Sequence, residues 1–441
     1  MWLWQTTEGY LPNVNAVWCQ SPKPEYKLET QRYVQPARCI PLVRSGTDLI
    51  VLPGGHAPTQ EFWDFHLSLH ANMREEQAIF TAGRHFCMDD DMDPLTVAHL
   101  RRQILKQPNA CWLLIPYAPT PNFLRWAEPM AAGLQKDGVK IFIFREDPQW
   151  LATYGDKGML HRHMDSLDRP SVIERIDKSI SVPRGYVCKT RQELLDARRL
   201  LADVNVCIKP LAGATGEGII LDASQQHLDT YDFPMGPVNL EEMLHLDLDE
   251  NKQAISPAMH YLGGEIIGEH MVDQVMQGAA YIGWRRSTVS PNFSEVAQQA
   301  MHKFLRKALP CGPGGFDFLS VDGQPFLTDI NTGRFNGAHA PKIFHTKYRS
   351  PNCNEFLCTK IEVPSSMSVH DVWSILQDSG LALTPEHGGA FPIMFLRGLK
   401  AQLCVFANDC DSAKQILRRA KGLLSRSTAN HGLIPKVADC S

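Results

Sequence analysis

The sequence predicts a mixed α/β and α+β protein made of several domains. In residues 1–147, short apolar runs alternate with helical patterns, which is typical of a parallel sheet with helices on its faces. Residues 148–345 mix strands and helices without that alternation, and residues 314–332 have the pattern of a β-hairpin. The chain has 441 residues, which is enough for two to four domains with sizeable cores.

Composition and charge exclude some classes of partner. The 44 lysines and arginines are balanced by 48 aspartates and glutamates, so we expect no basic surface for nucleic acid or membrane. Twelve cysteines without a CxxC pair favour free thiols in a reducing compartment. The sequence has no signal-peptide pattern and no run of about 18 apolar residues, so we expect a cytoplasmic protein without a membrane-spanning helix.

The first domain is expected to begin after a proline-rich segment, residues 1–47, that we expect to be irregular. Its expected strands are four short apolar runs, at residues 48–52, 77–82, 110–117 and 139–144. A helix is expected over 94–106, and another follows Thr120, a residue type that caps helix N-termini.

A glycine-rich loop follows an expected strand that ends at Lys209. Its three glycines, Gly213, Gly216 and Gly218, allow the backbone to approach a ligand, and successive N–H groups can bind an anion. The loop lacks the Lys-Ser/Thr of a Walker motif, and its GxxGxG spacing before a strand differs from a dinucleotide fingerprint. A lysine at the end of the preceding strand favours a phosphate-binding loop over a plain hairpin turn.

Acidic side chains lie on both strands of the expected hairpin. Asp317 is in the first strand, and Asp329 and Asn331 are two apart in the second, so these two share a face. A three-residue loop over 322–324, or a bulge of equal parity, places Asp317 opposite Asp329. Neighbouring carboxylates repel each other unless a cation lies between them, and Mg²⁺ prefers hard oxygen ligands. The alternative is a surface hairpin with ordinary acids, but the apolar neighbours of both acids argue for burial.

Other polar residues are weaker candidates. Gln274 and the adjacent pair Arg285 and Arg286 are candidates for substrate binding, because two guanidinium groups could bind a carboxylate; a surface pair is an equal alternative. His161 and His163 are two apart and cannot share a helical face, so we expect solvated histidines rather than a metal pair.

The remaining segments indicate architecture rather than chemistry. Residues 290–309 have a continuous apolar stripe at helical spacing, which predicts a core helix. The acidic stretch over 231–250 has, by itself, the pattern of a solvated helix face. After about residue 346 the pattern changes to a small α+β region, in which we find no motif that carries chemistry.

Two lysines, a glycine loop, two acids, an amide and an arginine together favour phosphoryl transfer from ATP. Over about residues 150–345 the sequence resembles the ATP-grasp superfamily. The matching stretches are GDKGML at 155–160, CIKPLAGATGEGI at 207–219 and FDFLSVDGQPFLTDINTGRFNGAH at 316–339. The preceding region resembles the α/β domain that such ligases carry, and residues 255–276 are similar to amino-acid and peptide ligases, including the pheganomycin-type peptide ligases.

The resemblance implies an ATP-grasp fold, in which two α+β subdomains hold ATP between them. An N-terminal α/β domain would cover residues 1–147, and the central subdomain with the glycine flap would cover 148–240. The C-terminal subdomain with the metal-binding hairpin would cover 241–345, followed by a small α+β appendage over 346–441.

The resemblance also implies which residues bind the nucleotide. Lys157 and Lys209 would contact the phosphates of ATP, with Lys209 also reaching toward the adenine. Residues 212–218, which include Thr215, would form the flap over the phosphates. The adenine-binding hinge would contain Glu241 and Glu242, and Asp247 would be near the ribose.

The metal and the reacting groups would be held by the hairpin and its exit. By the same resemblance, Asp317, Asp329 and Asn331 would hold one or two Mg²⁺. Arg334 would stabilise the acyl phosphate and the tetrahedral adduct, and Lys209 is the second catalytic candidate.

The expected activity is that of an ATP-dependent carboxylate–amine ligase. Such an enzyme phosphorylates an acid with ATP, and an amine then attacks the acyl phosphate to give an amide or peptide bond, ADP and phosphate. Small-molecule acids and amines, in particular amino acids or peptides, would be the partners, and a homo-oligomer is possible. The alternatives are an ATP-grasp kinase acting on an alcohol and a non-catalytic nucleotide-binding protein.

Overall fold

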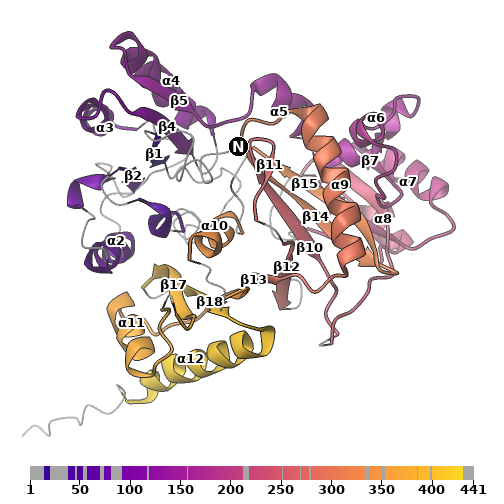
Figure 1. Ribbon diagram of the computed structural model, residues 1–441. Helices are drawn as coiled ribbons and strands as arrows, with labels where there is room; N and C mark the ends of the chain where they lie inside the picture. Colours follow the sequence, from indigo (N-terminus) through magenta and orange to yellow (C-terminus); the bar gives the residue numbers. More distant parts are fainter. Residues whose placement is uncertain are drawn as a thin grey trace, which may run out of the picture.

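Three sheets organise the part of the chain that the structure describes (Figure 1). The computed structural model describes residues 14–19, 38–44, 47–52, 57–69, 74–80, 92–116, 119–155, 157–211, 218–250, 252–268, 270–277, 280–333, 335, 338–348, 353–384, 386–397 and 400–430. Within that part of the chain, no helix is long and apolar enough to cross a membrane.

The N-terminal domain is built on a parallel sheet of five strands in the order β3-β2-β1-β4-β5. The strands are β1 (Val14–Cys19), β2 (Leu49–Leu52), β3 (Ala78–Phe80), β4 (Cys111–Pro116) and β5 (Lys140–Ile143). Its helices are α2 (Ala57–Leu69), α3 (Pro94–Leu105) and α4 (Pro121–Lys136), with 3-10 turns η2 (Ile40–Leu42) and η3 (Glu75–Gln77). The four predicted strands and both predicted helices are therefore confirmed.

Strand β1 corrects the expectation that residues 1–47 are irregular. All six of its residues are buried, and it pairs in parallel with both β2 and β4, so it is the central strand. Proline is frequent around this segment, but the run Val14–Cys19 itself contains none and can therefore donate to both neighbouring strands.

The central subdomain contains a four-stranded sheet in the order β6-β7-β9-β8. Its strands are β6 (Arg162–His163), β7 (Gly185–Cys188), β8 (Val206–Pro210) and β9 (Val238–Glu242). Its helices are α5 (Pro148–Tyr154), α6 (Val172–Ile176), α7 (Arg191–Leu200) and α8 (Gln225–Thr230), with 3-10 turns η4 (Lys157–Leu160) and η5 (Met164–Ser166). The stretch 231–250, which we expected to resemble a solvated helix, instead contains the buried strand β9.

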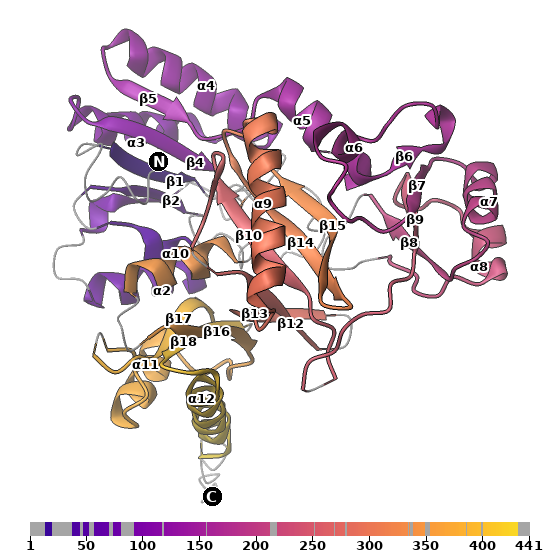
Figure 2. The same ribbon diagram turned by 45° about the vertical axis from the view of Figure 1, so that its right-hand side comes forward.

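The third sheet is the largest and carries the acidic hairpin. Its order is β15-β14-β10-β12-β13-β16-β18-β17, with β11 paired to β10. The strands are β10 (Pro257–Leu262), β11 (Glu265–Ile266), β12 (Val272–Gln277), β13 (Ala280–Arg286), β14 (Pro313–Val321), β15 (Gln324–Thr332), β16 (Glu355–Ile361), β17 (Gly389–Leu396) and β18 (Lys400–Ala407). The predicted core helix is α9 (Pro291–Ala308), capped by Ser290, and it lies across β10 and β14 (Figure 2).

Helix α9 covers one face of the sheet and leaves the other face available. Its stripe of Phe293, Met301 and Phe304 packs with apolar residues of β14 and β15 such as Phe316 and Leu327. Because side chains alternate along a strand, the acids between these apolar residues point to the opposite face.

The residues after 346 do not form a sheet of their own. Strand β16 pairs with β13, so β16, β18 and β17 extend the large sheet by three strands. Helices α10 (His339–Tyr348), α11 (Val369–Asp378) and α12 (Cys410–Asn430) complete this part, and α2 of the N-terminal domain packs on β17 in the same apolar cluster. The expected appendage is thus part of the large sheet, because its strand β16 pairs with β13 and the strands β18 and β17 follow.

Candidate functional site

The hairpin β14–β15 places its two aspartates directly opposite each other. Asp317 and Asp329 are Cα partners in the antiparallel pair, as predicted. The predicted three-residue loop is wrong, because Val321 pairs with Gln324 across a two-residue turn. The register shifts next to Asp317, where one extra residue, Thr328, bulges from β15, so the alternative of a bulge is the correct one.

Asn331 belongs to the same group of side chains. Its Nδ2 donates to Oδ2 of Asp317 at 2.8 Å, so the amide and the carboxylate share one face of the β14–β15 hairpin, which we call the ribbon. The amide oxygen of Asn331 is a further acceptor beside the two carboxylates.

The bulge has a second consequence, because it presents a backbone carbonyl to Lys209. The Nζ of Lys209 donates to the carbonyl oxygen of Thr328 at 2.5 Å, which joins strand β8 to the ribbon. Strand β8 alternates regularly: Val206 and Ile208 are in the apolar cluster beneath α7 and α8, and Lys209 lies on the other face. The predicted strand that ends on a lysine therefore leads to the acidic hairpin.

Glu241 lies beside Lys209 on the same face of the four-stranded sheet. Its Oε1 is 3.9 Å from Nζ of Lys209, and the same oxygen accepts from Nδ2 of Asn239 at 3.1 Å. Lys209 and Asn239 are Cα partners, and Asn239 and Glu241 are two apart in β9, so all three side chains face the same way.

His161 corrects the expectation of a solvated histidine. It is only 4% exposed, and its Nε2 is 3.0 Å from Oε1 of Glu241. Our sequence reasoning missed His161 and Asn239. The alternation of β9 is a signal for Asn239, since Val238 and Leu240 are apolar and Asn239 precedes Glu241 by two positions; we find no comparable signal for His161.

Lys157 reaches the ribbon from a separate segment. It begins the 3-10 turn η4, and its Nζ is 3.5 Å from Oδ2 of Asp329. The structure therefore brings together Lys157, Lys209, Asp317, Asp329 and Asn331, which come from three segments of the chain.

The opposite charges of Lys209 and its neighbouring carboxylates keep these groups ionised. Burial disfavours the charged form of Lys209, but the carboxylates of Glu241 and Asp329 outweigh it and raise the pKa of the lysine. Burial likewise disfavours the ionised form of Glu241, but Lys209 and the hydrogen bond from His161 lower its pKa to about 2. At neutral pH both groups are therefore ionised.

The ribbon has a donor set that fits Mg²⁺. Two carboxylates on adjacent strands and one amide supply hard oxygen ligands, which this ion usually supplements with phosphate oxygens and water. In the described part of the chain, no cluster of three or more His, Cys, Asp or Glu side chains could hold a metal by itself. A metal at Asp317 and Asp329 would accordingly depend on ligands from a substrate.

Two of the expected nucleotide contacts have other partners. Asp247, expected near the ribose, accepts hydrogen bonds from Ser320 Oγ at 2.6 Å and from the backbone N–H groups of Asp322 and Gly323 at 3.2 and 2.8 Å. Its carboxylate therefore stabilises the turn of the ribbon, which a sequence pattern could not reveal. Glu242 pairs with Arg184 at 2.8 Å, on the face of β9 opposite to Glu241.

The adjacent arginines do not form a joint carboxylate site. Successive residues of a strand point to opposite faces, so the two guanidinium groups diverge. Arg285 pairs with Asp249 at 2.8 Å and lies 3.6 Å from Asp273, whereas Arg286 pairs with Glu355 at 2.8 Å. The expectation that Arg285 and Arg286 bind one substrate group together is therefore wrong.

Gln274 lies on the same face of the large sheet as the acids. Ala258 of β10 is the Cα partner of both Asp317 and Val272, and Gln274 follows Val272 by two positions. The half-buried Gln274 thus remains a candidate for substrate contact, two strands away from Asp317.

Several expected site residues lie outside the described residues. They are Arg334, Gly213, Thr215 and Gly216. Beyond the expected flap, Ile220 forms an antiparallel bridge with Ile208 of β8. Gly218 has φ +76°, and a Cβ there would lie 3.0 Å from Pro210, so this position requires glycine.

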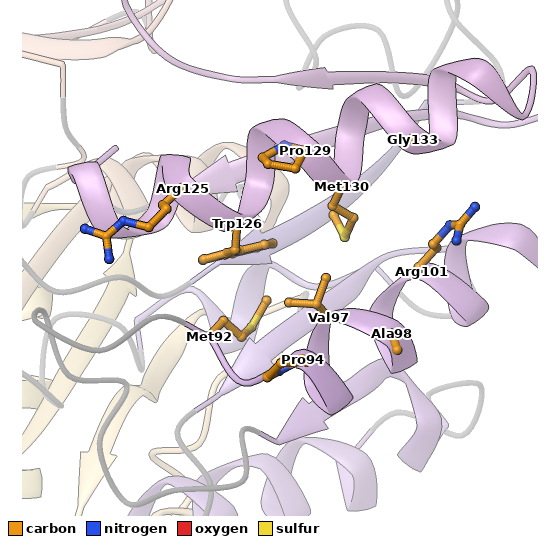
Figure 3. A pocket seen from close by; sticks show the side chains of 10 residues that line it. All are labelled: Met92, Pro94, Val97, Ala98, Arg101, Arg125, Trp126, Pro129, Met130 and Gly133. Carbon is orange, nitrogen blue, oxygen red and sulfur yellow. The ribbon is translucent and has the colours of Figure 1, made fainter.

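A groove elsewhere in the molecule is not part of this site. It has a volume of about 540 Å³ and lies between α3 and α4 of the N-terminal domain, where Trp126 and Met130 face Met92 and Val97 (Figure 3). None of the ten residues that line this groove is a candidate residue of the site around Asp317 and Asp329.

Comparison with known proteins supports the fold. No family model matches the sequence, and no curated protein matches it. Among solved structures, the ADP complex of an N5-carboxyaminoimidazole ribonucleotide synthetase superposes with a TM-score of 0.54 at 10% identity, covering 95% of this chain and 98% of the other. The enzyme of the same name from Thermus thermophilus gives 0.53 at 9% identity, covering 93% and 98% of the two chains. Biotin carboxylase from Campylobacter jejuni gives 0.53 at 12% identity, covering 90% and 88%.

The chain therefore has the ATP-grasp fold with a preceding α/β domain. Coverage above nine-tenths of both chains in the first two comparisons includes the N-terminal domain and the C-terminal strands. The narrower resemblance to pheganomycin-type peptide ligases finds no support in these comparisons.

Proposed function

We propose that this protein is an ATP-dependent carboxylate–amine ligase. The observation that carries the proposal is the pairing of Asp317 with Asp329 on the ribbon, with Lys157 3.5 Å from Asp329 and Lys209 bonded to the adjacent bulge. Two cations beside two carboxylates form a site for a polyphosphate and its metal ion.

The residues have distinct roles in this proposal. Lys157 and Lys209 bind the phosphates of ATP and hold them in line with the acid. Asp317, Asp329 and Asn331 hold one or two Mg²⁺, which would neutralise charge that develops on the transferred phosphoryl group. Arg334, in the segment after the ribbon, is proposed to bind the acyl phosphate and the tetrahedral adduct.

The names of the structural neighbours suggest a range of acids. Three of the neighbours contain ADP and another is a complex with β-γ-ATP, in agreement with ATP as the phosphoryl donor here. Those neighbours are named as carboxyaminoimidazole synthetases and a biotin carboxylase, so bicarbonate is to be tested as the acid together with amino acids.

The test is a product analysis with defined acids and amines. The protein is incubated with ATP, Mg²⁺ and either bicarbonate or mixed amino acids, and ADP, AMP, phosphate and pyrophosphate are measured. We expect ADP and phosphate, released only when an acid and an amine are both present. Release of AMP and pyrophosphate would rule out the acyl-phosphate route, and a phosphorylated alcohol formed without amine would indicate a kinase.

A matched pair of variants separates catalysis at the ribbon from contaminating activity. Asp329→Asn is expected to abolish product formation, whereas Asp229→Asn, at an exposed position in α8, should leave it unchanged. ATP turnover that survives Asp329→Asn would place the activity elsewhere or favour a non-catalytic nucleotide-binding protein.

A further inference from the structure

We propose that His161 is a positioning residue of the nucleotide site, which holds Glu241 in place for Lys209 and tethers the turn that carries Lys157. The inference rests on the proposed function, because it takes both lysines to bind the phosphates of ATP.

The contact between His161 and Glu241 has a defined polarity. Glu241 is ionised at neutral pH and its carboxylate can only accept hydrogen bonds, so Nε2 of His161 carries the proton and donates across 3.0 Å. Oε1 receives this bond, a second from Asn239 and the attraction of Lys209 at 3.9 Å. Two hydrogen-bond donors and one cation around one oxygen fix the rotamer of Glu241, and the charge of Glu241 fixes the position of the ammonium group.

The same histidine also restrains Lys157. The backbone N–H of His161 donates to the carbonyl of Gly158 at 3.0 Å, which closes the 3-10 turn that begins at Lys157. The imidazole then attaches the end of this turn to strand β9. One side chain therefore links the segment of Lys157 to the sheet that carries Lys209.

Gly185 leaves the space that this arrangement needs. It is the Cα partner of Glu241 in the pair of β7 and β9. A Cβ at Gly185 would lie 3.1 Å from Cε1 of His161, 3.1 Å from Cγ of Glu241 and 2.9 Å from the carbonyl oxygen of Leu240. The imidazole can approach the strand only because no side chain stands between them.

The stability of the fold alone does not require the pair of His161 and Glu241. Replacing both members of a buried polar pair with apolar residues of similar volume is often neutral or stabilising. A donor that orients a carboxylate is needed where the carboxylate positions a functional cation.

The test compares variants that differ in the reach of a donor. In His161→Gln the amide nitrogen reaches the position of Nε2, in His161→Asn it is one methylene too short, and in His161→Ala it is absent. His163→Ala is the control, because His163 lies two residues further along the chain, at the start of η5. Binding of ATP with Mg²⁺ is measured by calorimetry, and KM for ATP and kcat are measured separately.

We expect His161→Ala and His161→Asn to bind ATP about tenfold more weakly, which corresponds to the loss of one hydrogen bond to a charged group. The change should appear in KM more than in kcat, and His161→Gln should recover most of it. Equal ATP affinity in the Gln and Asn variants and the wild type would overturn the proposal. If His161→Ala does not fold, the comparison of Gln with Asn carries the test.

Hydrogen exchange without nucleotide separates this inference from the proposed function. We expect faster exchange of the amides in the turn Lys157–Leu160 in the Asn variant than in the Gln variant. If this difference is found but the wild-type protein binds no ATP, the role in nucleotide binding is refuted and the tether alone remains. Unchanged exchange together with normal ATP binding by the wild type would refute the role of His161 and leave the ligase proposal intact.

Discussion

Lys209→Met is the substitution that tests the buried charges most directly. The Lys209 side chain is 18% exposed and that of Glu241 is 6% exposed, so their interaction is weakly screened by water. Methionine preserves the length and apolar contacts of lysine but removes the positive charge and the hydrogen bond to Thr328. Glu241 then keeps its burial and its bonds from His161 and Asn239 but loses its main cation.

The expected magnitude follows from the pKa of Glu241. This pKa lies near 2 against an ordinary value of 4.5, which favours the ionised form in the folded state by about 3 kcal/mol. Because the folded pKa is below the unfolded one, this stabilisation is present above pH of about 4.5 and is lost as the pH falls toward 2. Removing one member of a buried pair costs about 3–5 kcal/mol, so we expect Lys209→Met to lose roughly that much at pH 7.

Unfolding by urea at several pH values is the assay. In Lys209→Met, the lysine no longer opposes the effect of burial, so the pKa of Glu241 is higher than in the wild type. As the pH falls, Glu241 becomes protonated, and the variant no longer holds an uncompensated buried charge. The difference in free energy of unfolding between the wild type and the variant should therefore be largest at pH 7 and should become smaller below pH of about 5.

Two further variants make the result interpretable. Lys189→Met removes the exposed ion pair with Asp165, at 2.6 Å, and should change the stability far less than Lys209→Met does, because water screens this pair. In the double variant Lys209→Met/Glu241→Gln, the buried charge is removed as well, and much of the lost stability should return. A double variant no more stable than Lys209→Met, or a deficit independent of pH, would refute the reasoning.

Three other predictions concern the ribbon and the sheet around it. Asp329→Asn should lower the turnover of ATP with Mg²⁺ by about 100-fold or more at an unchanged thermal midpoint, and normal turnover would exclude this aspartate as a metal ligand. Asp247→Ala should destabilise the protein by about 1–3 kcal/mol through loss of the turn's hydrogen bonds; weaker ATP binding at full stability would instead assign it to the ribose. Arg285→Ala should lower the free energy of unfolding in urea by about 2–4 kcal/mol, because it removes the cation beside the buried Asp249. Arg286 is more exposed, so Arg286→Ala should lower it by about 1 kcal/mol, and equal losses would contradict this ranking.

The contacts that our sequence reasoning did not foresee share a physical cause. His161 was expected in solvent because it and His163 are two apart and cannot form a metal pair on one helical face, yet Glu241, 80 residues further along, lies 3.0 Å from it. The family resemblance implied Asp247 near the ribose, and it gave no sign that Ser320, Asp322 and Gly323 of the hairpin donate hydrogen bonds to this carboxylate. In both cases the deciding partner comes from another segment, and local sequence patterns carry no information about such a contact.

Local periodicity in the sequence by itself determined the strands β2 to β5 of the N-terminal domain, the helices α3, α4 and α9, and the inward face of α9. Alternation along β8 and β15 also determined that Lys209 points away from the core, and that Asp329 and Asn331 leave the ribbon on one side. These are properties of neighbouring residues, so they can be read without knowledge of the fold.

Only the tertiary structure decided how these faces meet. The bulge at Thr328, rather than a longer turn, brings Asp317 opposite Asp329, and the approach of strand β8 and of the turn η4 brings Lys209 and Lys157 to the ribbon. It also decided that the last strands continue the large sheet beside β13. The physical reason is that strand register and charge pairing depend on the sum of many distant contacts, whereas the faces of a strand depend only on the alternation of its own side chains.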